Sequence, residues 1–344
     1  MLQQTQVKTV IPFWNRWLRE LPTIEAVAQA PSEKIHKLWE GLGYYTRVRN
    51  LQKAAQQIVK SGKRKAESGN SVCQFPEKFE DVLALPGIGR YTAGAICSIA
   101  FNQPTPILDG NVIRVLTRIF GIAENPKAKI TNARLWQLAE ELVSHAKTQG
   151  SQRKIVPAFA VSAPLRENVS CSFLNQSLME LGALICTPRN PQCLICPAKK
   201  LCVAFKENRV AALPNLGKRE VATARRFMAF VLAGNGKFLV RQRPTGVVNA
   251  HLWEFPNVEV DARLCDPQRV ASKILGFTPK KLEPLCTVKH SITRYRITLE
   301  AYTVEATRQR KADGRWFTLE QLRRLAFSSA HRKILGCIQN ESKS

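Results

Sequence analysis

The sequence predicts an all-α domain followed by a smaller α+β domain. Up to about residue 186, apolar residues recur at helical spacing, and polar or Gly/Pro-containing turns separate the segments. A cysteine-rich loop at 186–202 ends this helical part. Beyond a charged linker, the pattern changes to short alternating runs that are typical of strands. We therefore place the first domain at 1–208, the linker at 209–224 and the second domain at 225–340.

Individual elements follow from the same periodicities. Helices of the first domain are expected at 7–20, 33–39, 46–60, 77–84, 90–101, 111–120, 131–146 and 173–186. Strands of the second domain are expected at 226–233, 237–243 and 294–306, with a hairpin turn at 234–236 and helices at 319–325 and 329–339. The polar, Gly/Ser-rich stretch 61–74 is interpreted as an exposed insertion, and the mixed stretch 148–171, which contains Pro157 and Pro164, as a loop insertion beside the fold.

The charge balance points to a polyanionic partner. The 344 residues include 52 Lys and Arg against 26 Asp and Glu, a formal net charge of +26. Such an excess favours nucleic acid and predicts binding that weakens steeply with salt, although a generic basic protein would show it too. No apolar run reaches the length of a membrane span and no signal peptide is visible, so we expect no membrane partner and a cytoplasmic, nucleoid-associated bacterial protein.

Four cysteines form one compact motif. Their spacing is C-x6-C-x2-C-x5-C, and the residues are Cys186, Cys193, Cys196 and Cys202. Four thiolates within one short loop suit a metal centre, and the uneven spacing differs from the paired C-x2-C units common at structural zinc sites. An iron–sulfur cluster, a zinc ion and unligated buried thiols are the three interpretations.

A glycine turn and one carboxylate stand out in the middle of the helical part. Gly87 and Gly89 lie in a turn that opens a helix, where backbone N–H groups can approach an anion such as a DNA phosphate. Asp109 directly precedes the next apolar helix. Taken alone, the turn is more often a plain connection between two helices, and the aspartate is more often a helix N-cap than a catalytic group.

These stretches together resemble a known family. The segments L-P-G-I-G-R-Y-T-A at 85–93 and I-L-D-G-N-V-I-R-V at 107–115 resemble the helix-hairpin-helix DNA glycosylases of the endonuclease III superfamily, and most closely the adenine DNA glycosylases. M-L-Q-Q-T-Q-V at 1–7, W-E-G-L-G-Y-Y-T-R-V-R-N-L at 39–51 and the four cysteines match in the same order. The resemblance implies a helix-hairpin-helix domain with a [4Fe-4S] cluster at the four cysteines, and a monomer acting on double-stranded DNA that contains an adenine mismatch.

The resemblance also assigns roles in the excision of a base. It implies that Asp109 stabilises the positive charge that develops on the deoxyribose as the N-glycosidic bond breaks, with Asn111 and Tyr91 lining the same pocket. Superfamily members that also nick the strand carry a Schiff-base lysine where this chain has Tyr91. A monofunctional glycosylase is therefore expected, and an endonuclease III type lyase is the disfavoured alternative.

Further residues are expected to contact the opposite strand. An extruded nucleotide leaves a gap that a wedge must fill. The resemblance implies that Gln4 and Thr5 contact the base opposite the adenine, with Leu42 and Tyr44 in the neighbouring wedge loop. Without the resemblance, Leu42 and Tyr44 would be interpreted as core residues.

One departure from the family lies at the start of the chain. Family members carry a general-acid glutamate two residues before the methionine of M-L-Q-Q-T, and this sequence begins at that methionine, Met1. General acids typically supply about 10²–10⁴-fold in rate, so the chain as written is expected to be impaired. A misplaced start site and a true truncation that binds mismatched DNA without turnover are the two explanations.

The second domain resembles the Nudix-like domain of adenine DNA glycosylases, which recognises 8-oxoguanine. The matching segment is R-Q-R-P-T-G-V-V-N-A-H-L-W-E-F-P at 241–256. A Nudix hydrolase needs clustered glutamates to hold Mg²⁺, but 257–280 offers Glu259 and two aspartates, so no pyrophosphatase activity is expected. In the reader loop, where the family usually has Phe-Ser-His, this chain has I-T-R at 292–294, and Thr293 keeps the hydroxyl.

Overall fold

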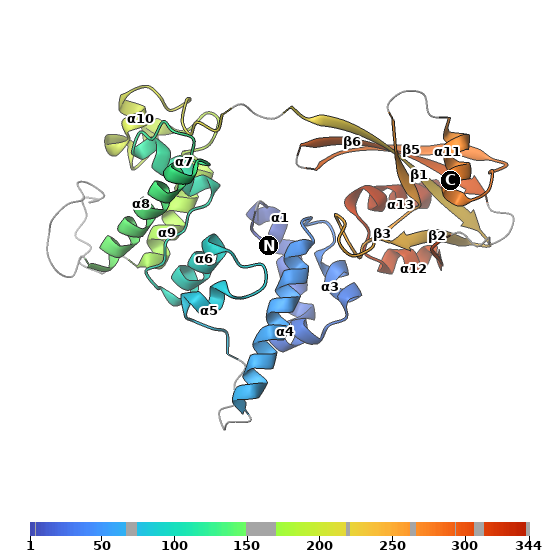
Figure 1. Ribbon diagram of the computed structural model, residues 1–344, viewed down its shortest axis with the longest axis horizontal. Coiled ribbons are helices and arrows are strands. Elements are labelled where there is room, and N and C mark those ends of the chain that lie inside the picture. The colour runs from blue at the N-terminus through green and yellow to red at the C-terminus, as the bar shows by residue number, and fades with distance from the viewer. Residues whose placement is uncertain are drawn as a thin grey trace. The chain divides into compact units, whose positions relative to one another are not determined.

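The computed structural model forms two compact units (Figure 1). One unit consists of residues 1–73 and 220–344, and the other of residues 74–219. The division by spatial contacts places the first helices in one unit with the C-terminal sheet. The domain boundaries at 208 and 225, which follow the order of the sequence, therefore stay a prediction. The structure describes residues 1–3, 5–66, 74–148, 170–217, 221–261, 266–292, 294–305 and 313–341.

Helices dominate the N-terminal part of the first unit. They are α1 (Val7–Glu20), α2 (Ile24–Gln29), α3 (Ser32–Trp39) and α4 (Thr46–Ala66). Their apolar faces meet in a core that includes Trp17, Ile35 and Trp39. The short α2, which the sequence reading missed, begins at a Thr23 cap whose hydroxyl accepts the Ala26 N–H. The expected helix at 46–60 is confirmed but continues to residue 66, so the first part of the proposed insertion at 61–74 is helical.

The C-terminal part of the same unit is a seven-stranded mixed sheet with helices on both faces. β1 and β6 pair in parallel at its centre, while the other neighbouring strands are antiparallel. The strands are β1 (Thr223–Gly234), β2 (Lys237–Gln242), β3 (Trp253–Glu254), β4 (Asn257–Val260), β5 (Leu282–Ile292), β6 (Tyr295–Glu305) and β7 (Arg315–Thr318). The expected α+β class is confirmed.

Alternation along β1 explains the three layers. Ala229 and Val231 face one core, which α12 (Leu319–Arg324) and α13 (Ser329–Glu341) cover. Met228 and Phe230 face the other core, which α11 (Pro267–Leu275) covers (Figure 1). A strand that is buried on both faces reads as a continuous apolar run, and residues 228–232 are such a run.

A buried histidine makes this part of the unit sensitive to acid. His331 of α13 accepts the Phe255 N–H at its Nδ1 atom, and burial lowers its pKa from 6.5 to about 4. Because the unfolded state takes up the proton more readily, stability should be lost as pH falls from about 6.5 towards 4, by up to about 3 kcal/mol. Urea denaturation at pH 7.5 and pH 5 measures this loss.

Two substitutions separate the contribution of His331 from that of other groups. His331→Asn keeps an acceptor for Phe255 but cannot be protonated, so it should flatten the pH dependence. His251→Asn, at a less buried histidine, serves as the control. An equal pH dependence in His331→Asn and the wild-type protein would contradict the prediction.

The second unit is helical. It contains α5 (Phe79–Leu83), α6 (Arg90–Phe101), α7 (Gly110–Ile119), α8 (Lys129–Thr148), α9 (Cys171–Glu180), a π-helical turn η1 (Leu181–Ile185), two 3₁₀ turns η2 (Cys193–Ile195) and η3 (Lys199–Leu201), and α10 (Val203–Lys206). These bounds confirm the helices expected in this region, except that the last long helix changes to the π-helical turn after Glu180. Most of the insertion expected at 148–171 lies outside the described residues. Among the helices of the described ranges, none combines the length and apolarity that crossing a bilayer requires.

Candidate functional site

The glycine turn forms a hairpin between α5 and α6. Gly87 has a φ of 77°, a conformation that disfavours residues with a side chain, and the Ile88 N–H donates to the Leu85 carbonyl. Gly89 is the N-cap of α6, and no atom lies within 4 Å of the place a Cβ would take. The first N–H groups of a helix have no partners within it, so this exposed turn can approach a phosphate closely.

Asp109 is held by contacts to both of its carboxylate oxygens. It is the N-cap of α7, where Oδ1 accepts the Val112 N–H at 2.7 Å. Its Oδ2 accepts the side-chain amide of Asn111 at 3.2 Å. Burial raises the pKa of the Tyr91 phenol, and the Asp109 carboxylate adds to this shift. The half-buried Asp109 carboxylate is therefore held by Asn111 and is close enough to Tyr91 to act on it electrostatically.

Two buried arginines connect this aspartate with the cysteine loop, and the sequence reading missed both. Arg114 donates to the Asn111 side chain at 2.8 Å and to the carbonyls of Gly182 and Cys186 at 2.6 and 2.7 Å. Arg118, one turn further along α7, donates to the Cys186 sulfur at 3.3 Å. Buried arginines need hydrogen-bond partners, so two of them on an otherwise apolar helix were a usable signal.

A glycine allows the close packing of this region. A Cβ on Gly182 would lie 2.6 Å from Asn111 Cβ and 3.0 Å from the Asn111 carbonyl oxygen. Gly182→Ala should therefore lower the free energy of unfolding by about 1–3 kcal/mol, because Asn111 has to move away from the added methyl group. Urea denaturation measures this loss.

The matched control for that change is Gly336→Ala in α13, where the added Cβ meets no atom within 4 Å. This protein should be at least as stable as the wild type, since alanine is the better helix former. Equal stability of Gly182→Ala and Gly336→Ala would contradict the packing argument.

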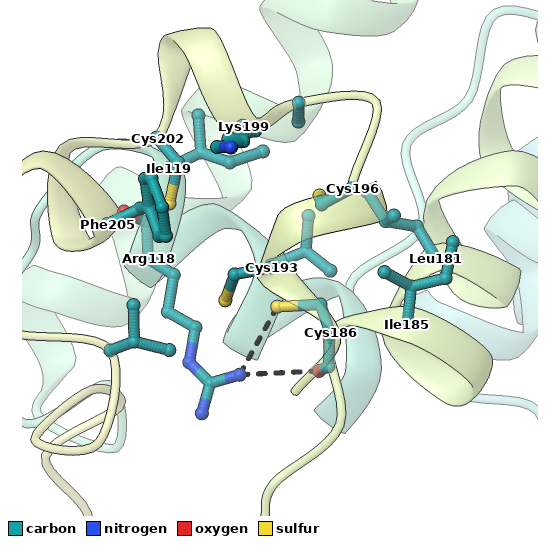
Figure 2. A pocket seen from close by; sticks show the side chains of 13 residues that line it. Arg118, Ile119, Leu181, Ile185, Cys186, Cys193, Cys196, Lys199, Cys202 and Phe205 are labelled. Carbon is teal, nitrogen blue, oxygen red and sulfur yellow. Dashed lines mark hydrogen bonds between the residues drawn. The ribbon is translucent and has the colours of Figure 1, made fainter. Parts of the chain in front are cut away.

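The four cysteines line one cavity (Figure 2). Cys186 follows the π-helical turn, Cys193 begins η2, and Cys196 and Cys202 flank the second 3₁₀ turn. The cavity has about 400 Å³ of space free of atoms, part of it open to solvent, and apolar side chains such as Val115, Ile119 and Leu181 line it. The segment thus folds around a shared space that cysteine sulfurs border.

The chemistry of the four cysteines can be compared with the two kinds of metal centre expected from the sequence. No group of three or more His, Cys, Asp or Glu side chains in the described ranges is arranged to hold one metal ion. A single zinc ion draws its sulfur ligands to about 2.3 Å, whereas an iron–sulfur cluster spreads its cysteines because they bind different irons. Burial raises the pKa of the Cys196 and Cys202 thiols, and neighbouring cysteines raise it further. A positively charged group bound in the cavity would offset the free energy that forming these buried thiolates costs.

A second group of candidate residues lies in the 41–45 loop of the other unit. Gly41, Gly43 and Tyr44 have φ values of 105°, 71° and 48°, so the chain turns sharply here. Tyr44 is 57% exposed, but Leu42 is only 7% exposed and belongs to the helical core. The loop thus presents the tyrosine ring to solvent and keeps the leucine inside.

Arg47 ties this loop to the start of the chain. Its guanidinium donates to the Gln3 carbonyl at 2.7 Å and lies 5.2 Å from the centre of the Tyr44 ring. Thr5 lies nearby in the sequence and is half-buried. Gln4 and Thr293, two further expected DNA contacts, lie outside the described residues.

Comparisons with known proteins match both the helical and the C-terminal parts of the chain. Residues 1–141 match the HhH-GPD superfamily of base excision DNA repair proteins, and residues 227–336 match the NUDIX domain. An adenine DNA glycosylase of Rattus norvegicus is 33% identical, over 97% of this chain and 69% of the relative. One from Buchnera aphidicola subsp. Schizaphis graminum is 29% identical, over 97% of this chain and 88% of the relative.

A solved structure of a thermostable thymine-DNA glycosylase is 26% identical, with a TM-score of 0.45 over 60% of this chain and 80% of that one. The rat relative, in contrast, spans nearly the whole of this chain, including both the helical and the Nudix-like parts. The chain therefore belongs to the adenine DNA glycosylases, enzymes of base excision repair within the HhH-GPD superfamily.

Proposed function

We propose that this chain hydrolyses the N-glycosidic bond of adenine mispaired with 8-oxoguanine or guanine, and leaves an abasic site in an unbroken strand. The observation that carries this proposal is the Asp109 carboxylate, which Val112 and Asn111 hold through both oxygens. Breaking the bond develops positive charge on the deoxyribose, and a fixed carboxylate next to the sugar stabilises that charge without having to reorganise.

Tyr91 supports a monofunctional reaction. A strand-nicking glycosylase forms a Schiff base with the sugar through an amine, and a phenol cannot form one. The raised pKa of Tyr91 keeps its hydroxyl protonated, so it can donate a hydrogen bond in the same pocket. We assign Asp109 to charge stabilisation, and Asn111 and Tyr91 to the lining of the sugar pocket.

Recognition of the opposite base is assigned to the other unit. Tyr44 is exposed on a sharply turned loop, so its ring can enter the base stack, while the buried Leu42 anchors the loop. Gln4 and Thr5 supply an amide and a hydroxyl for the edge of the base. In the Nudix-like domain, Thr293 is proposed to contact 8-oxoguanine.

The Nudix-like domain is proposed to bind without hydrolysing. Arg225 holds the Glu259 carboxylate in an ion pair, and Asp266 caps α11 by accepting the Gln268 N–H. These two carboxylates therefore have structural partners. The helix α11 itself carries no Asp or Glu. A Mg²⁺ site of the hydrolytic kind needs several free oxygen ligands.

We further propose that Cys186, Cys193, Cys196 and Cys202 hold a [4Fe-4S] cluster. The apolar cavity that they share and the Arg118 donor to the Cys186 sulfur support this assignment. When bound, the cluster would fix the fold of the loop. The loop also carries the cations Arg189, Lys199 and Lys200, which suit a phosphate backbone.

The hairpin at Gly87 and Gly89 is proposed to hold the DNA backbone next to the lesion, and the net charge of +26 supports such binding. Since one lesion needs one such site, we propose a monomer that acts on double-stranded chromosomal DNA within the nucleoid.

A glycosylase assay tests the proposal directly. Duplexes with adenine opposite 8-oxoguanine, guanine or thymine are incubated with the protein and then treated with alkali, which cuts at abasic sites. We expect strand cleavage in the duplexes with adenine opposite 8-oxoguanine or guanine, and none in the duplex with thymine. That cleavage should require the alkali treatment, and borohydride should trap no covalent adduct. Equal affinity for all three duplexes together with no release of adenine would refute the proposal.

A further inference from the structure

Glu40 occupies the junction between α3 and the 41–45 loop. It is the C-cap of α3 and directly precedes Gly41, the first of the loop residues with positive φ. The direction in which the chain leaves Glu40 therefore sets where Tyr44 is presented. A constraint on the Glu40 side chain acts on the start of the loop, four residues before the exposed ring.

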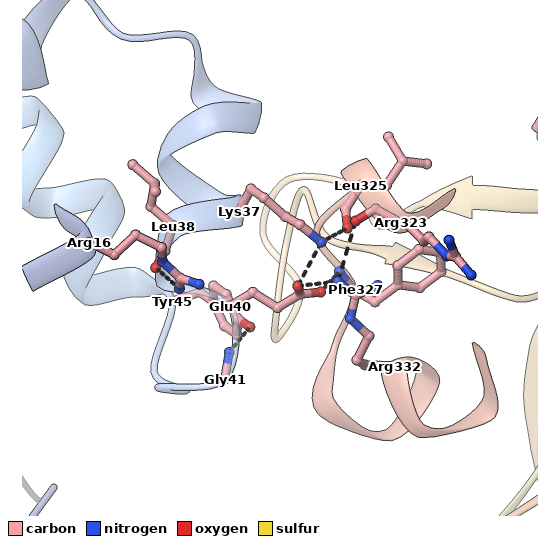
Figure 3. Close-up of polar contacts among 10 residues, drawn as sticks. All are labelled: Arg16, Lys37, Leu38, Glu40, Gly41, Tyr45, Arg323, Leu325, Phe327 and Arg332. Carbon is pink, nitrogen blue, oxygen red and sulfur yellow. Dashed lines mark hydrogen bonds and ion pairs between the residues drawn. The ribbon is translucent and has the colours of Figure 1, made fainter. Parts of the chain in front are cut away.

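The Glu40 carboxylate makes three contacts, and two of them reach the Nudix-like domain (Figure 3). Its Oε1 accepts the Phe327 backbone N–H at 2.8 Å, and its Oε2 accepts the Arg332 guanidinium at 2.6 Å. Lys37 donates to the same Oε2 at 2.8 Å and also to the Leu325 carbonyl at 2.9 Å. Only 11% of the Glu40 side chain is exposed, so these are strong, partly desolvated, charge-assisted bonds.

Apolar packing and a further hydrogen bond hold the same two parts of the chain together. Leu252 and Ala326, both from the C-terminal part, belong to the core that the N-terminal helices form. Arg49 of α4 donates to the Ala250 carbonyl at 3.0 Å. The contact is thus a packed and bonded junction rather than a single ion pair.

The loop is braced from the helical side as well. The Gly41 N–H donates to the Tyr45 hydroxyl at 3.3 Å, and the Trp39 indole donates to the Gly43 carbonyl at 3.0 Å. Because these hydrogen bonds hold the 41–45 loop in one conformation, a shift of Glu40 moves the whole loop, including Tyr44. A loop that was flexible at each residue would absorb such a shift before it reached Tyr44.

We propose that Glu40 is a positioning residue that couples the Nudix-like domain to the 41–45 loop, so that contact of the domain with the opposite base sets the position of Tyr44. This inference rests on the proposed function. According to it, the Nudix-like domain and the 41–45 loop together determine the selectivity for the opposite base, and the Glu40 carboxylate connects them. A carboxylate with a purely structural role would affect all duplexes equally, whereas a coupling residue alters the preference between them.

Glu40→Gln tests the coupling with little change in volume. The amide oxygen can still accept one hydrogen bond, but the charge that binds Arg332 and Lys37 is lost. The matched control is Glu300→Gln. Glu300 is also a half-buried carboxylate that binds an arginine, Arg226 at 2.8 Å, but that pair lies within the sheet.

Two readouts are taken on the full-length variants. One is the ratio of dissociation constants for duplexes with adenine opposite 8-oxoguanine and opposite guanine. The other is the fluorescence of 2-aminopurine placed next to the opposite base, which rises when Tyr44 unstacks it. For Glu40→Gln we expect the ratio to move about tenfold towards one and the fluorescence rise to shrink, because the lost charge-assisted bond is worth about one tenfold step. Glu300→Gln should keep both at the wild-type value.

The outcomes separate this inference from the proposed function. An unchanged ratio and fluorescence in Glu40→Gln, or equal changes in Glu300→Gln, would overturn the coupling. If the wild-type protein does not discriminate between the duplexes, the proposed selectivity fails, and the fluorescence on the adenine–guanine duplex decides the role of Glu40. The double variant Glu40→Gln/Arg332→Met tests whether the coupling acts through this ion pair. A ratio of dissociation constants and a fluorescence rise equal to those of either single variant would support it.

Discussion

Asp109→Asn is expected to slow the release of adenine by about 10²–10³-fold, the magnitude lost when one aligned electrostatic stabiliser is removed from an active site. Asparagine has nearly the same shape and is an equally good N-cap, so its oxygen can still accept the Val112 N–H that begins α7. What it lacks is the negative charge next to the sugar. Single-turnover excision from a duplex with adenine opposite 8-oxoguanine measures the rate.

A binding measurement tests the same role without turnover. A duplex in which a positively charged pyrrolidine replaces the deoxyribose mimics the charge of the transition state, and a neutral abasic analogue does not. Asp109→Asn should bind the charged mimic more weakly and the neutral analogue as well as the wild type does.

Asp266→Asn is the control, since Asp266 caps α11 in the same manner but in the Nudix-like domain. This variant should keep the wild-type rate of adenine release and the wild-type affinities for the charged mimic and the neutral analogue. Undiminished excision and undiminished binding of the charged mimic in Asp109→Asn would remove the aspartate from the reaction.

Cys196→Ser is expected to remove the proposed [4Fe-4S] cluster from the cysteine loop and to unfold the loop. Cys196 borders the cavity together with the three other cysteines of the motif, and a serine oxygen is a poor ligand for iron. Because a metal group binds the folded loop more tightly than the unfolded chain, its loss also removes folding free energy. Iron and sulfide analysis, the visible absorbance of the cluster and the thermal midpoint measure these effects.

Cys337→Ser provides the comparison, since Cys337 is also a half-buried thiol but lies on α13, away from the motif. It should retain the iron content and the visible absorbance of the wild type. Purified wild-type protein that contained zinc in place of iron would show that the cavity holds a different group. Full iron content in Cys196→Ser would show that this thiol is not a ligand.

Local periodicity was enough to predict most long helices. α1, α6 and α7 begin and end within about two residues of the expected ranges, since each shows a helical apolar repeat. The short elements α2, α10, β3, β4 and β7 were missed, and so were the longer β5 and α11. A segment of two to six residues holds too few repeats for a period to be recognised, and pairing with distant strands decides its conformation.

The roles of the site residues stay predictions. The family resemblance pointed to Asp109, and the cysteine spacing pointed to a metal centre. Neither gave a reason to connect the aspartate with the cysteines, because the connection runs through Arg114 and Arg118, whose partners include carbonyls some 70 residues away in the chain. Hydrogen bonds to backbone atoms leave no residue pattern from which a partner can be read.

Charge, helix periods and cysteine spacing are properties of neighbouring residues, and the sequence by itself determined them: a basic chain, a helical domain with a cysteine loop, and a following α+β domain. Only the tertiary structure decided that Leu42 is buried while Tyr44 is exposed, and that Glu40 binds Phe327 and Arg332 across nearly 300 positions. The physical reason is that burial and long-range hydrogen bonds depend on which surfaces meet. That choice belongs to the whole folded chain and not to any one segment.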